Sequence, residues 1–356
     1  MGALARNERI TLGGALAATV LAGALRFMNA DAVLAFVVAA VALAMLAAVV
    51  GEATDQLGER LSPGATGVLQ SGIGNLPELF VGFFALRAGL VAVVQAALIG
   101  SILANSLLVL GLAFLVGGLR NGTQQFASES PRMIATLTLL AVAALVVPTL
   151  AHALHTPADA HEGALSVACA VVLLIVFIVS IPVSLRGGPS ALPSRGEDAH
   201  HAVAWPLWLA VAILAVAGVA AAFVSDWFVA ALEPAITVLH LSQAFTGLVI
   251  VAIAGNAVEN VVGIQLAARN KPDYAVSVIL NSSLQVALGL TPILVLLSFL
   301  ISDTHMTLVL PPLLVAALGL ATALGAIIVY DGESIWLEGV ALIGLYGMLA
   351  TSFWWG

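Results

Sequence analysis

The sequence predicts an all-α membrane protein of about eleven transmembrane helices, in which a first helix precedes two inverted repeats of five helices. Three observations carry this prediction. The 356 residues are 62% hydrophobic and 8% charged, whereas a soluble domain carries about 25% charged residues. Apolar runs of about 18 or more residues recur along the whole chain, as expected of helices that cross a bilayer. Two segments about 180 residues apart share a polar motif, which indicates an internal repeat.

Apolar runs bounded by charges, prolines and polar clusters locate the individual helices. The predicted spans are residues 10–28, 31–57, 62–87, 90–119, 131–150, 162–185, 203–230, 241–268, 273–301, 306–330 and 333–354. The first run lies in MGALARNERITLGGALAATVLAGALRF, whose composition also suits a cleavable signal peptide. A second apolar run follows almost at once, so we expect the first span to be retained.

These spans divide the chain into four parts. They are an amino-terminal segment with the first helix (1–30), a first five-helix repeat (31–185), a linker (186–202) and a second five-helix repeat (203–356). The linker region contains RGGPSALPSRGEDAHH, the longest hydrophilic stretch of the chain, which is rich in Gly, Pro and Ser. We expect this linker on the cytoplasmic side.

The basic residues predict the orientation of the chain in the membrane. With a cytoplasmic amino terminus, all Lys and Arg residues except Arg26 and Arg87 lie on the inner side. Positive charges gather in cytoplasmic loops, so we predict an integral, multi-pass membrane protein with its amino terminus inside and its carboxyl terminus outside. Histidines and acidic residues, including His152, Asp331 and Glu333, are placed at or near the outer face.

A shift of 181 residues superimposes the two polar motifs, GNLPEL (74–79) and GNAVEN (255–260). The motifs share Gly, Asn and Glu, and downstream Val, Gly, Ser and Leu positions also match at this shift without a gap. Upstream, a shift of 180 aligns LSxxxTG at 61–67 with LSxxxTG at 241–247. Chance is a poor explanation for matching polar residues in so apolar a chain. Because five spans separate the copies, they cross the membrane in opposite senses, as inverted repeats of secondary transporters do.

Each motif places oxygen-bearing side chains on one helical face. Asn75 and Glu78 in the first copy, and Asn256 and Glu259 in the second, are spaced i,i+3. The helices that follow the motifs carry further polar groups, namely Ser101, Asn105, Ser282, Ser283 and Gln285. Oxygen donors without thiolates or imidazoles suit Ca²⁺, which accepts about 6–8 oxygen ligands, better than they suit softer metals. We therefore interpret this set as a metal-binding site.

Glu78 and Glu259 are the candidates for proton coupling. Two carboxylates that face each other in a low dielectric cannot both stay ionised, so the empty pair should take up protons. A divalent cation stabilises both charges and expels the protons, which is the minimum requirement for antiport. Hydrogen bonding between helices explains Ser101 or Asn105 alone equally well. A membrane-embedded glutamate costs roughly 2.5–3.5 kcal/mol or more and instead indicates function.

The two copies differ in how they loosen the helix. Pro77 lacks a backbone donor and its ring displaces the carbonyl of Ile73, so we expect a freed carbonyl near the first motif. In the second copy Val258 stands in the proline position. Gly255 is then the residue that loosens the helix.

The segments GNLPELFVGFFALRAGLVAVVQAALIGSILANSLLVLG and GNAVENVVGIQLAARNKPDYAVSVILNSSLQVALGLTPILVL resemble the two alpha repeats of the Ca²⁺/H⁺ antiporter (cation/proton exchanger) family, within the calcium:cation antiporter superfamily. The match is densest over 64–119 and 243–300. This resemblance implies a proton-driven, eleven-helix transporter of prokaryotic inner (plasma) membranes or eukaryotic vacuoles. It implies Ca²⁺ and H⁺ as substrates, no cofactor, and Glu78 and Glu259 as the central ligands.

Three departures from the family pattern bear on function. Asn260 replaces the usual histidine after the second glutamate, and Asn281 replaces the usual glycine before the following serine. The acidic segment of plant and fungal members is reduced to Glu197 and Asp198. LPEL in the first motif also resembles Na⁺/Ca²⁺ exchangers. Na⁺-driven Ca²⁺ exchange, and exchange of another cation such as Mn²⁺ or Na⁺ for protons, therefore stay open.

Other classes of protein find less support. HEGAL at 161–165 begins like the HExxH motif of zinc proteases, but Leu165 occupies the second histidine position, so an intramembrane enzyme is the weaker alternative and we expect no enzymatic activity. The single cysteine, Cys169, excludes a disulfide framework. We expect the lipid bilayer as the environment and no nucleic acid as a partner. The sequence does not decide whether the protein forms an oligomer.

Overall fold

The structure is a computed structural model that describes residues 6–28, 30–58, 60, 73–186 and 205–355. Most of the predicted linker and the first copy of LSxxxTG lie outside the described residues. The described part is nearly all helical. Seven of its helices are long and apolar enough to cross a membrane, or eight if Gln243–Gly255 and Asn260–Ala268 form one bent span.

The chain forms two compact units. Unit 1 comprises residues 1–88, 181–240 and 254–258, and unit 2 comprises residues 89–180, 241–253 and 259–356. Each unit contains segments from both predicted repeats. The described helices that belong wholly to unit 1 are α1 (Arg6–Phe27), α2 (Ala32–Gly58), α4 (Leu76–Arg87) and α9 (Leu207–Leu239).

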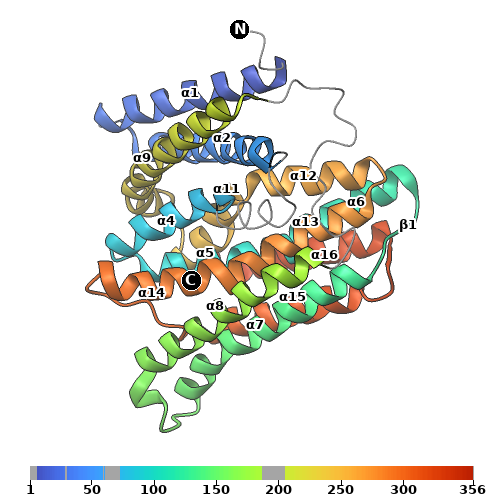
Figure 1. The fold of residues 1–356 in the computed structure, drawn as a ribbon. Helices are drawn as coiled ribbons and strands as arrows, with labels where there is room; N and C mark the ends of the chain where they lie inside the picture. Colours follow the sequence, from blue (N-terminus) through green and yellow to red (C-terminus); the bar gives the residue numbers. More distant parts are fainter. Residues whose placement is uncertain (1–5, 29, 59, 61–72, 187–204, 356) are drawn as a thin grey trace. The chain divides into compact units, whose positions relative to one another are not determined.

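In unit 1, α2 packs along both α1 and α9, and α4 packs against α9 (Figure 1). Phe36 of α2 stacks on Phe228 of α9, with 4.9 Å between ring centroids. Such offset aromatic pairs add to the stability that apolar burial supplies. Helix α9 ends at Leu239 rather than at residue 230 as predicted, so it continues well beyond the expected span.

Trp205 fixes the start of α9 to the rest of unit 1. Its side chain is fully buried. Its backbone N donates a hydrogen bond of 2.8 Å to Gln56 Oε1, and its indole Nε1 donates one of 3.1 Å to Glu8 Oε2. Arg60 also donates to the carbonyl of Trp205. The chain that enters α9 is therefore tied to both α1 and α2.

Unit 2 contains most of the remaining elements. Its α-helices are α5 (Val91–Leu103), α6 (Leu110–Asn121), α7 (Glu129–Ala153), α8 (Glu162–Arg186), α10 (Gln243–Phe245), α13 (Pro272–Gln285), α14 (Thr291–Ile301), α15 (Pro312–Ile328) and α16 (Trp336–Ser352), of which α8 ends in unit 1. Its other helical segments are the π-helices η1 (Ala104–Val109), η3 (Thr246–Val251) and η4 (Val286–Leu290) and the 3₁₀-helix η2 (Asp159–His161). Helices α11 (Ala252–Gly255) and α12 (Ala257–Ala268) cross the boundary between the units.

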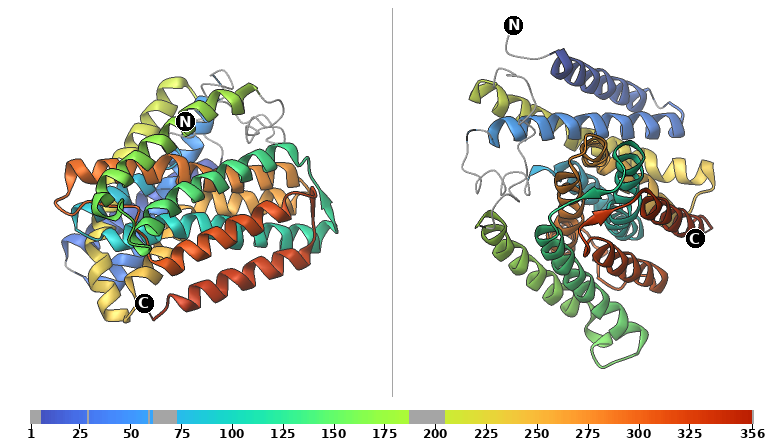
Figure 2. Two further views of the ribbon diagram at one scale, coloured as in Figure 1. Left: turned by 90° about the horizontal axis from the view of Figure 1, so that it is seen from below. Right: turned by 90° about the vertical axis from the view of Figure 1, so that its right-hand side faces the viewer.

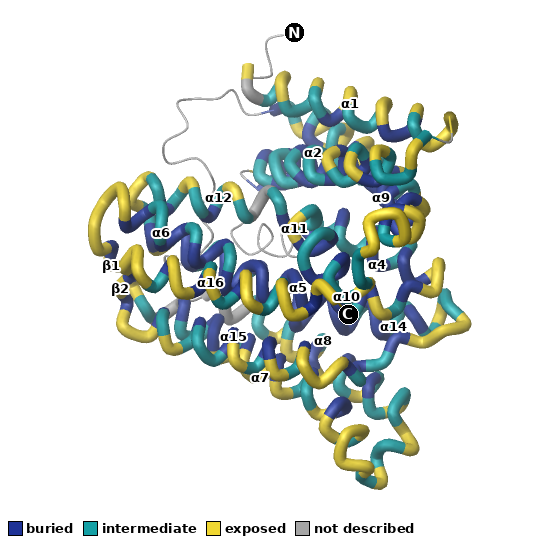
Figure 3. The backbone as a smooth tube through the Cα atoms, turned by 180° about the vertical axis from the view of Figure 1, so that it is seen from behind, coloured by how far each residue is buried: buried dark blue, intermediate teal, exposed yellow. Residues whose placement is uncertain are grey.

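Two glycines allow α5 and η3 to meet at backbone distance. A Cβ atom on Gly100 would lie 2.3 Å from the carbonyl oxygen of Leu248, and one on Gly247 would lie 2.5 Å from that of Val93. Only glycine fits at so close a helix crossing. Figure 3 shows that α5 is largely buried, whereas one flank of α1 is exposed. The helix after the first motif therefore packs closely against the segment before the second motif.

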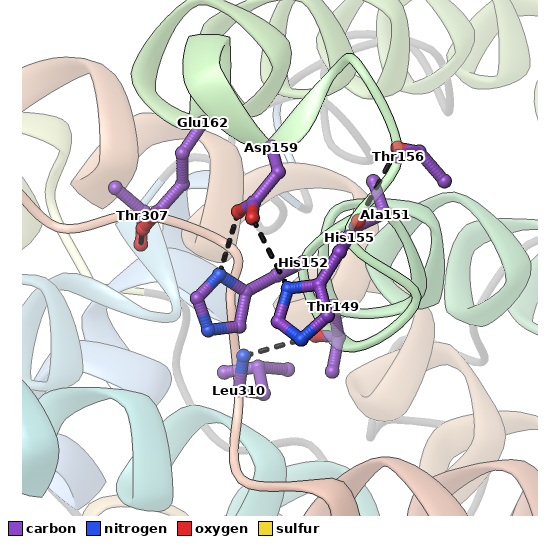
Figure 4. Close-up of polar contacts among 9 residues, drawn as sticks. All are labelled: Thr149, Ala151, His152, His155, Thr156, Asp159, Glu162, Thr307 and Leu310. Carbon is purple, nitrogen blue, oxygen red and sulfur yellow. Dashed lines mark hydrogen bonds and ion pairs between the residues drawn. The ribbon is translucent and has the colours of Figure 1, made fainter.

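The tenth predicted span begins later than expected, because α15 starts at Pro312 rather than at residue 306. Residues 302–311 form an irregular segment that side chains of α7 and α8 hold in place (Figure 4). Thr149 Oγ1 accepts a hydrogen bond of 2.9 Å from Leu310 N, and Glu162 Oε1 accepts one of 2.6 Å from the Thr307 hydroxyl. Proline fits the first turn of a helix, where no backbone donor is needed, so the helix starts after this segment.

A small two-stranded sheet corrects one sequence prediction. Strand β1 (Gln124–Gln125) pairs antiparallel with β2 (Glu333–Ser334), and Figure 2 draws them as a green and a red arrow side by side in its right-hand view. Arg132 Nε also donates a hydrogen bond of 3.0 Å to the carbonyl of Tyr330. The loop with Asp331 and Glu333 therefore lies at the same end of unit 2 as Arg132. The sequence predicts Arg132 on the inner side and these two acids at or near the outer face. Since all three lie at one end of unit 2, the position predicted for the acids is wrong when Arg132 is taken as the reference.

Candidate functional site

The first motif stands at a helix start rather than inside a continuous helix. Residues 74 and 75 form a turn, and α4 begins at Leu76 with Asn75 in the N-cap position. Pro77 therefore lies in the first turn, where its missing donor costs no hydrogen bond. The break expected near the first motif is present at residues 74 and 75, directly after Ile73 and before Pro77.

Glu78 lies in the first turn of α4. The unpaired backbone N–H groups and the dipole of a helix start stabilise negative charge at this position. Its Oε1 atom is nonetheless buried and has no hydrogen-bond partner among the described residues. A buried carboxylate oxygen without a partner is costly, so this atom is a candidate cation or proton ligand.

The second motif meets Glu78 within unit 1. A Cβ atom on Gly255 would lie 2.7 Å from Glu78 Cγ and 3.3 Å from Glu78 Oε1. The glutamate side chain therefore occupies the space that a side chain at this glycine would need. Asn256, the next residue, is 0% exposed, and Asn75 is also buried. The structure thus brings Glu78 of the first motif against the glycine of the second.

The helix of the second motif is interrupted, as the sequence predicts for Gly255. Helix α11 ends at Gly255, Asn256 lies in a turn, and α12 begins at Ala257. The backbone of Glu259 belongs to α12, whereas its side chain lies outside the described part, so its role stays a prediction. Asn260 Oδ1 is buried without a hydrogen-bond partner among the described residues. The position that departs from the family pattern thus carries an unsatisfied oxygen.

In unit 2 the predicted polar patches of α5–η1 and α13 touch each other. Asn105 Nδ2 donates a hydrogen bond of 3.0 Å to Ser282 Oγ. Ser106 and Ser283, one residue further along each helix, have their hydroxyls 3.3 Å apart. The sequence reasoning did not single out Ser106, although its spacing from Asn105 places it on an adjoining face. Ser101 and Gln285, the remaining predicted ligands of this unit, are also buried.

A π-helical turn lies at an equivalent place in each of these two segments. Segment η1 contains Asn105 and Ser106, and η4 directly follows Gln285. Such turns add a residue to the helical repeat and are frequent at functional sites. The repeat shift of 181 residues superimposes η1 on residues 285–290, which include all of η4. The sequence does not reveal these turns, because no Pro or Gly marks their start.

A second polar cluster lies in the connection between α7 and α8 of unit 2 (Figure 4). Asp159 accepts from His152 Nδ1 at 2.8 Å and lies 3.6 Å from His155 Nδ1. Glu162, the acid of HEGAL, accepts the hydroxyl of Thr307. The described residues contain no group of three or more His, Cys, Asp or Glu side chains arranged to hold a metal ion. Glu162 therefore has a hydrogen-bond partner in the irregular segment 302–311.

An apolar helical chain that carries buried acidic and amide side chains at helix breaks has the architecture of a membrane transport protein. The chain belongs to the sodium/calcium exchanger protein family, whose profile matches residues 32–186 and 209–355. It is 35% identical to a Ca²⁺/H⁺ antiporter of Synechocystis sp. over 339 residues, which cover 89% of this chain and 90% of that protein.

Two further comparisons agree with this family. A Ca²⁺/H⁺ antiporter of Aphanothece halophytica is 33% identical over 348 residues, covering 92% of this chain and 91% of that protein. The crystal structure of selenium-substituted Ca²⁺/H⁺ antiporter protein YfkE superimposes with a TM-score of 0.81 at 29% identity, covering 97% of this chain and 99% of that chain. The similarity therefore extends over nearly the whole length in sequence and in fold.

Proposed function

We propose that this protein exchanges Ca²⁺ for H⁺ across a membrane by alternating access, with Glu78 and Glu259 as ligands that both ions share. The observation that carries this proposal is the buried, unpartnered Oε1 of Glu78, which lies against Gly255 of the second motif. The names of the relatives in Synechocystis and Aphanothece support the choice of ions. The hard oxygen donors of the motifs support it independently.

The exchange follows from competition for one charged site. When Ca²⁺ is absent, the low dielectric favours protonation of the glutamate pair. When Ca²⁺ enters, both carboxylates are stabilised in their charged forms and release their protons to the side that is open. Asn75, Asn256, Ser101, Asn105, Ser282 and Gln285 supply neutral oxygens in this proposal. Neutral donors complete the coordination of Ca²⁺ without adding negative charge that would bind the ion too tightly for release.

The proposed architecture is a first helix followed by two inverted repeats, spans two to six and seven to eleven. The matching π-turns η1 and η4 support such a repeat, as do the helix breaks at both motifs. Inverted repeats with broken helices near the midplane provide one site that faces either side in turn. The distribution of Lys and Arg supports a cytoplasmic amino terminus, and bacterial relatives support a plasma-membrane location.

Luminal pH in proteoliposomes tests the proposed exchange. Vesicles that contain the protein and a pH-sensitive dye are loaded at acidic pH and diluted into alkaline buffer without Ca²⁺. Adding external Ca²⁺ should raise the luminal pH, because protons leave as Ca²⁺ enters. Protein-free vesicles serve as the control. A luminal pH that does not respond to Ca²⁺, in vesicles that take up Ca²⁺ when loaded with Na⁺, would instead identify Na⁺-driven exchange.

A further inference from the structure

A cavity of about 690 Å³ lies within unit 1 between α4 and α9. This volume falls in the range of small-molecule pockets, roughly 300–1,000 Å³. Two of its lining residues, Val219 and Phe223, are each 59% exposed, so the cavity opens on the surface of the unit. The residues that define its walls here are Leu76, Phe80 and Phe84 of α4 and Gly218, Ala222 and Asp226 of α9.

The cavity is separate from the candidate cation site. Leu76, Phe80 and Phe84 recur every fourth residue and so share one face of α4. Glu78 projects from the opposite face of this helix, toward Gly255. Asp226 is the only charged residue among the lining residues. An apolar chamber of this kind does not provide the oxygen donors that a metal cation needs.

The cavity needs an apolar occupant. A Cβ atom on Gly218 would meet nothing within 4 Å, so open space reaches the backbone of α9. Unfilled space forfeits the dispersion contacts that close packing supplies. Water compensates poorly, because apart from Asp226 the lining side chains offer it no hydrogen-bond partners. Helix α9 is long and apolar enough to cross a membrane, so the acyl chains of the bilayer are the apolar groups at hand.

Two charges of opposite sign flank the cavity. Arg87 follows Phe84 by three residues and therefore lies on the face of α4 that lines the cavity. Its guanidinium lies 6.0 Å from the ring centroid of Phe83. Asp226 lies on the α9 side. Both residues are exposed, and neither forms an ion pair with another described residue. A cation on one helix and an anion on the other match the two charges of a zwitterionic headgroup.

We propose that this cavity binds one acyl chain of a phosphatidylethanolamine lipid, with the lipid phosphate at Arg87 and its primary ammonium at Asp226. Guanidinium and phosphate form paired charge-assisted hydrogen bonds. A primary ammonium donates hydrogen bonds to a carboxylate, which the quaternary ammonium of phosphatidylcholine cannot do. Phosphatidylglycerol offers no cation to Asp226. The proposal is independent of cation exchange, because none of its residues is a predicted cation ligand.

Native mass spectrometry of the purified full-length protein tests the proposal. The protein is incubated with phosphatidylethanolamine, phosphatidylcholine or phosphatidylglycerol of identical acyl chains, and retained lipid is counted. One phosphatidylethanolamine should be retained with about tenfold preference over phosphatidylcholine, as expected for one charge-assisted hydrogen bond. Asp226→Asn should abolish this preference but keep binding. Arg87→Gln should weaken binding of both lipids.

Filling the cavity provides the second arm of the test. Gly218→Leu should remove the retained lipid, and Ala222→Leu serves as an alternative filling variant if the first does not fold. Val216→Leu is the matched control, because Val216 also lies on α9, is 69% exposed and does not line the cavity. Equal retention of the three lipids by the wild type would overturn the headgroup assignment. Undiminished retention by a folded filling variant would overturn the cavity as the binding site.

Discussion

Asn105 of η1 donates a hydrogen bond of 3.0 Å to Ser282 of α13, so the polar patch after the first motif contacts the patch after the second. Both side chains are almost fully buried, at 1% and 4% exposure. The neighbouring Ser106–Ser283 contact repeats this arrangement one residue along each helix. Two successive contacts set the register between the two segments. Any movement of one against the other must break or exchange these hydrogen bonds.

Replacing Asn105 or Ser282 with alanine should weaken unit 2 and Ca²⁺ binding together. Hydrogen bonds between membrane helices contribute about 0.6 kcal/mol and at most about 1.7 kcal/mol. Thermal unfolding of Asn105→Ala, Ser282→Ala and the double variant should give a coupling free energy of this size. Ser106→Ala is the control, because Ser106 is not a predicted ligand and should lower stability without changing Ca²⁺ affinity. An equal loss of Ca²⁺ affinity in Ser106→Ala would show that packing, and not ligation, explains the effect.

Glu78→Gln should abolish exchange while the protein still folds. The amide keeps the shape of the side chain but removes the charge that balances Ca²⁺. Loss of an outer-shell partner costs about 10–100-fold in metal affinity, so loss of a direct charged ligand should exceed about 100-fold. Calcium affinity measured by calorimetry checks this, and Glu259→Gln should behave alike. Glu233→Gln, on the exposed face of α9, should leave affinity unchanged. Wild-type Ca²⁺ affinity in Glu78→Gln would contradict the assignment of Glu78 as a Ca²⁺ ligand.

Gly255→Ala should displace Glu78 without unfolding the chain. The added methyl group would lie 2.7 Å from Glu78 Cγ, which is too close for an unshifted side chain. We expect a loss of Ca²⁺ exchange with a modest change in thermal stability, because a side chain rather than a backbone must move. Gly344→Ala is the matched control, since its Cβ would meet nothing within 4 Å in α16. If Gly255→Ala exchanged Ca²⁺ at the wild-type rate, the close contact between Gly255 and Glu78 would not be part of the functional site.

Gly100→Ala should destabilise the protein more than Gly255→Ala does. Its methyl group would lie 2.3 Å from the carbonyl oxygen of Leu248, and a backbone cannot yield as a side chain can. Overpacking of this kind costs about 1–3 kcal/mol or more. Thermal unfolding should show a lower midpoint than for Gly319→Ala, whose Cβ would have open space in α15. Equal midpoints for the two variants would mean that α5 and η3 are not held at backbone distance.

The sequence predicts much of this fold because apolar runs and helix breaks are local signals. GNLPEL and GNAVEN locate both breaks, and Gly255 interrupts its helix as expected. Contacts between segments that are far apart in the chain are harder to predict from the sequence. The irregular segment 302–311 is held by Thr149 and Glu162, so hydropathy alone extends the span through it. Likewise Ser106 becomes notable only when Ser283 is found opposite.

Labelled Ca²⁺ uptake into proteoliposomes tests the proposed exchange most directly. Vesicles are loaded at acidic pH without Na⁺ and diluted into alkaline buffer with labelled Ca²⁺, and a parallel set is loaded with Na⁺ at equal pH on both sides. Shared occupancy of Glu78 and Glu259 by Ca²⁺ and H⁺ predicts uptake in the first set, collapse of that uptake by a protonophore or nigericin with K⁺, and no uptake in the second set. Uptake that the Na⁺ gradient drives and the pH gradient does not would contradict Ca²⁺/H⁺ exchange.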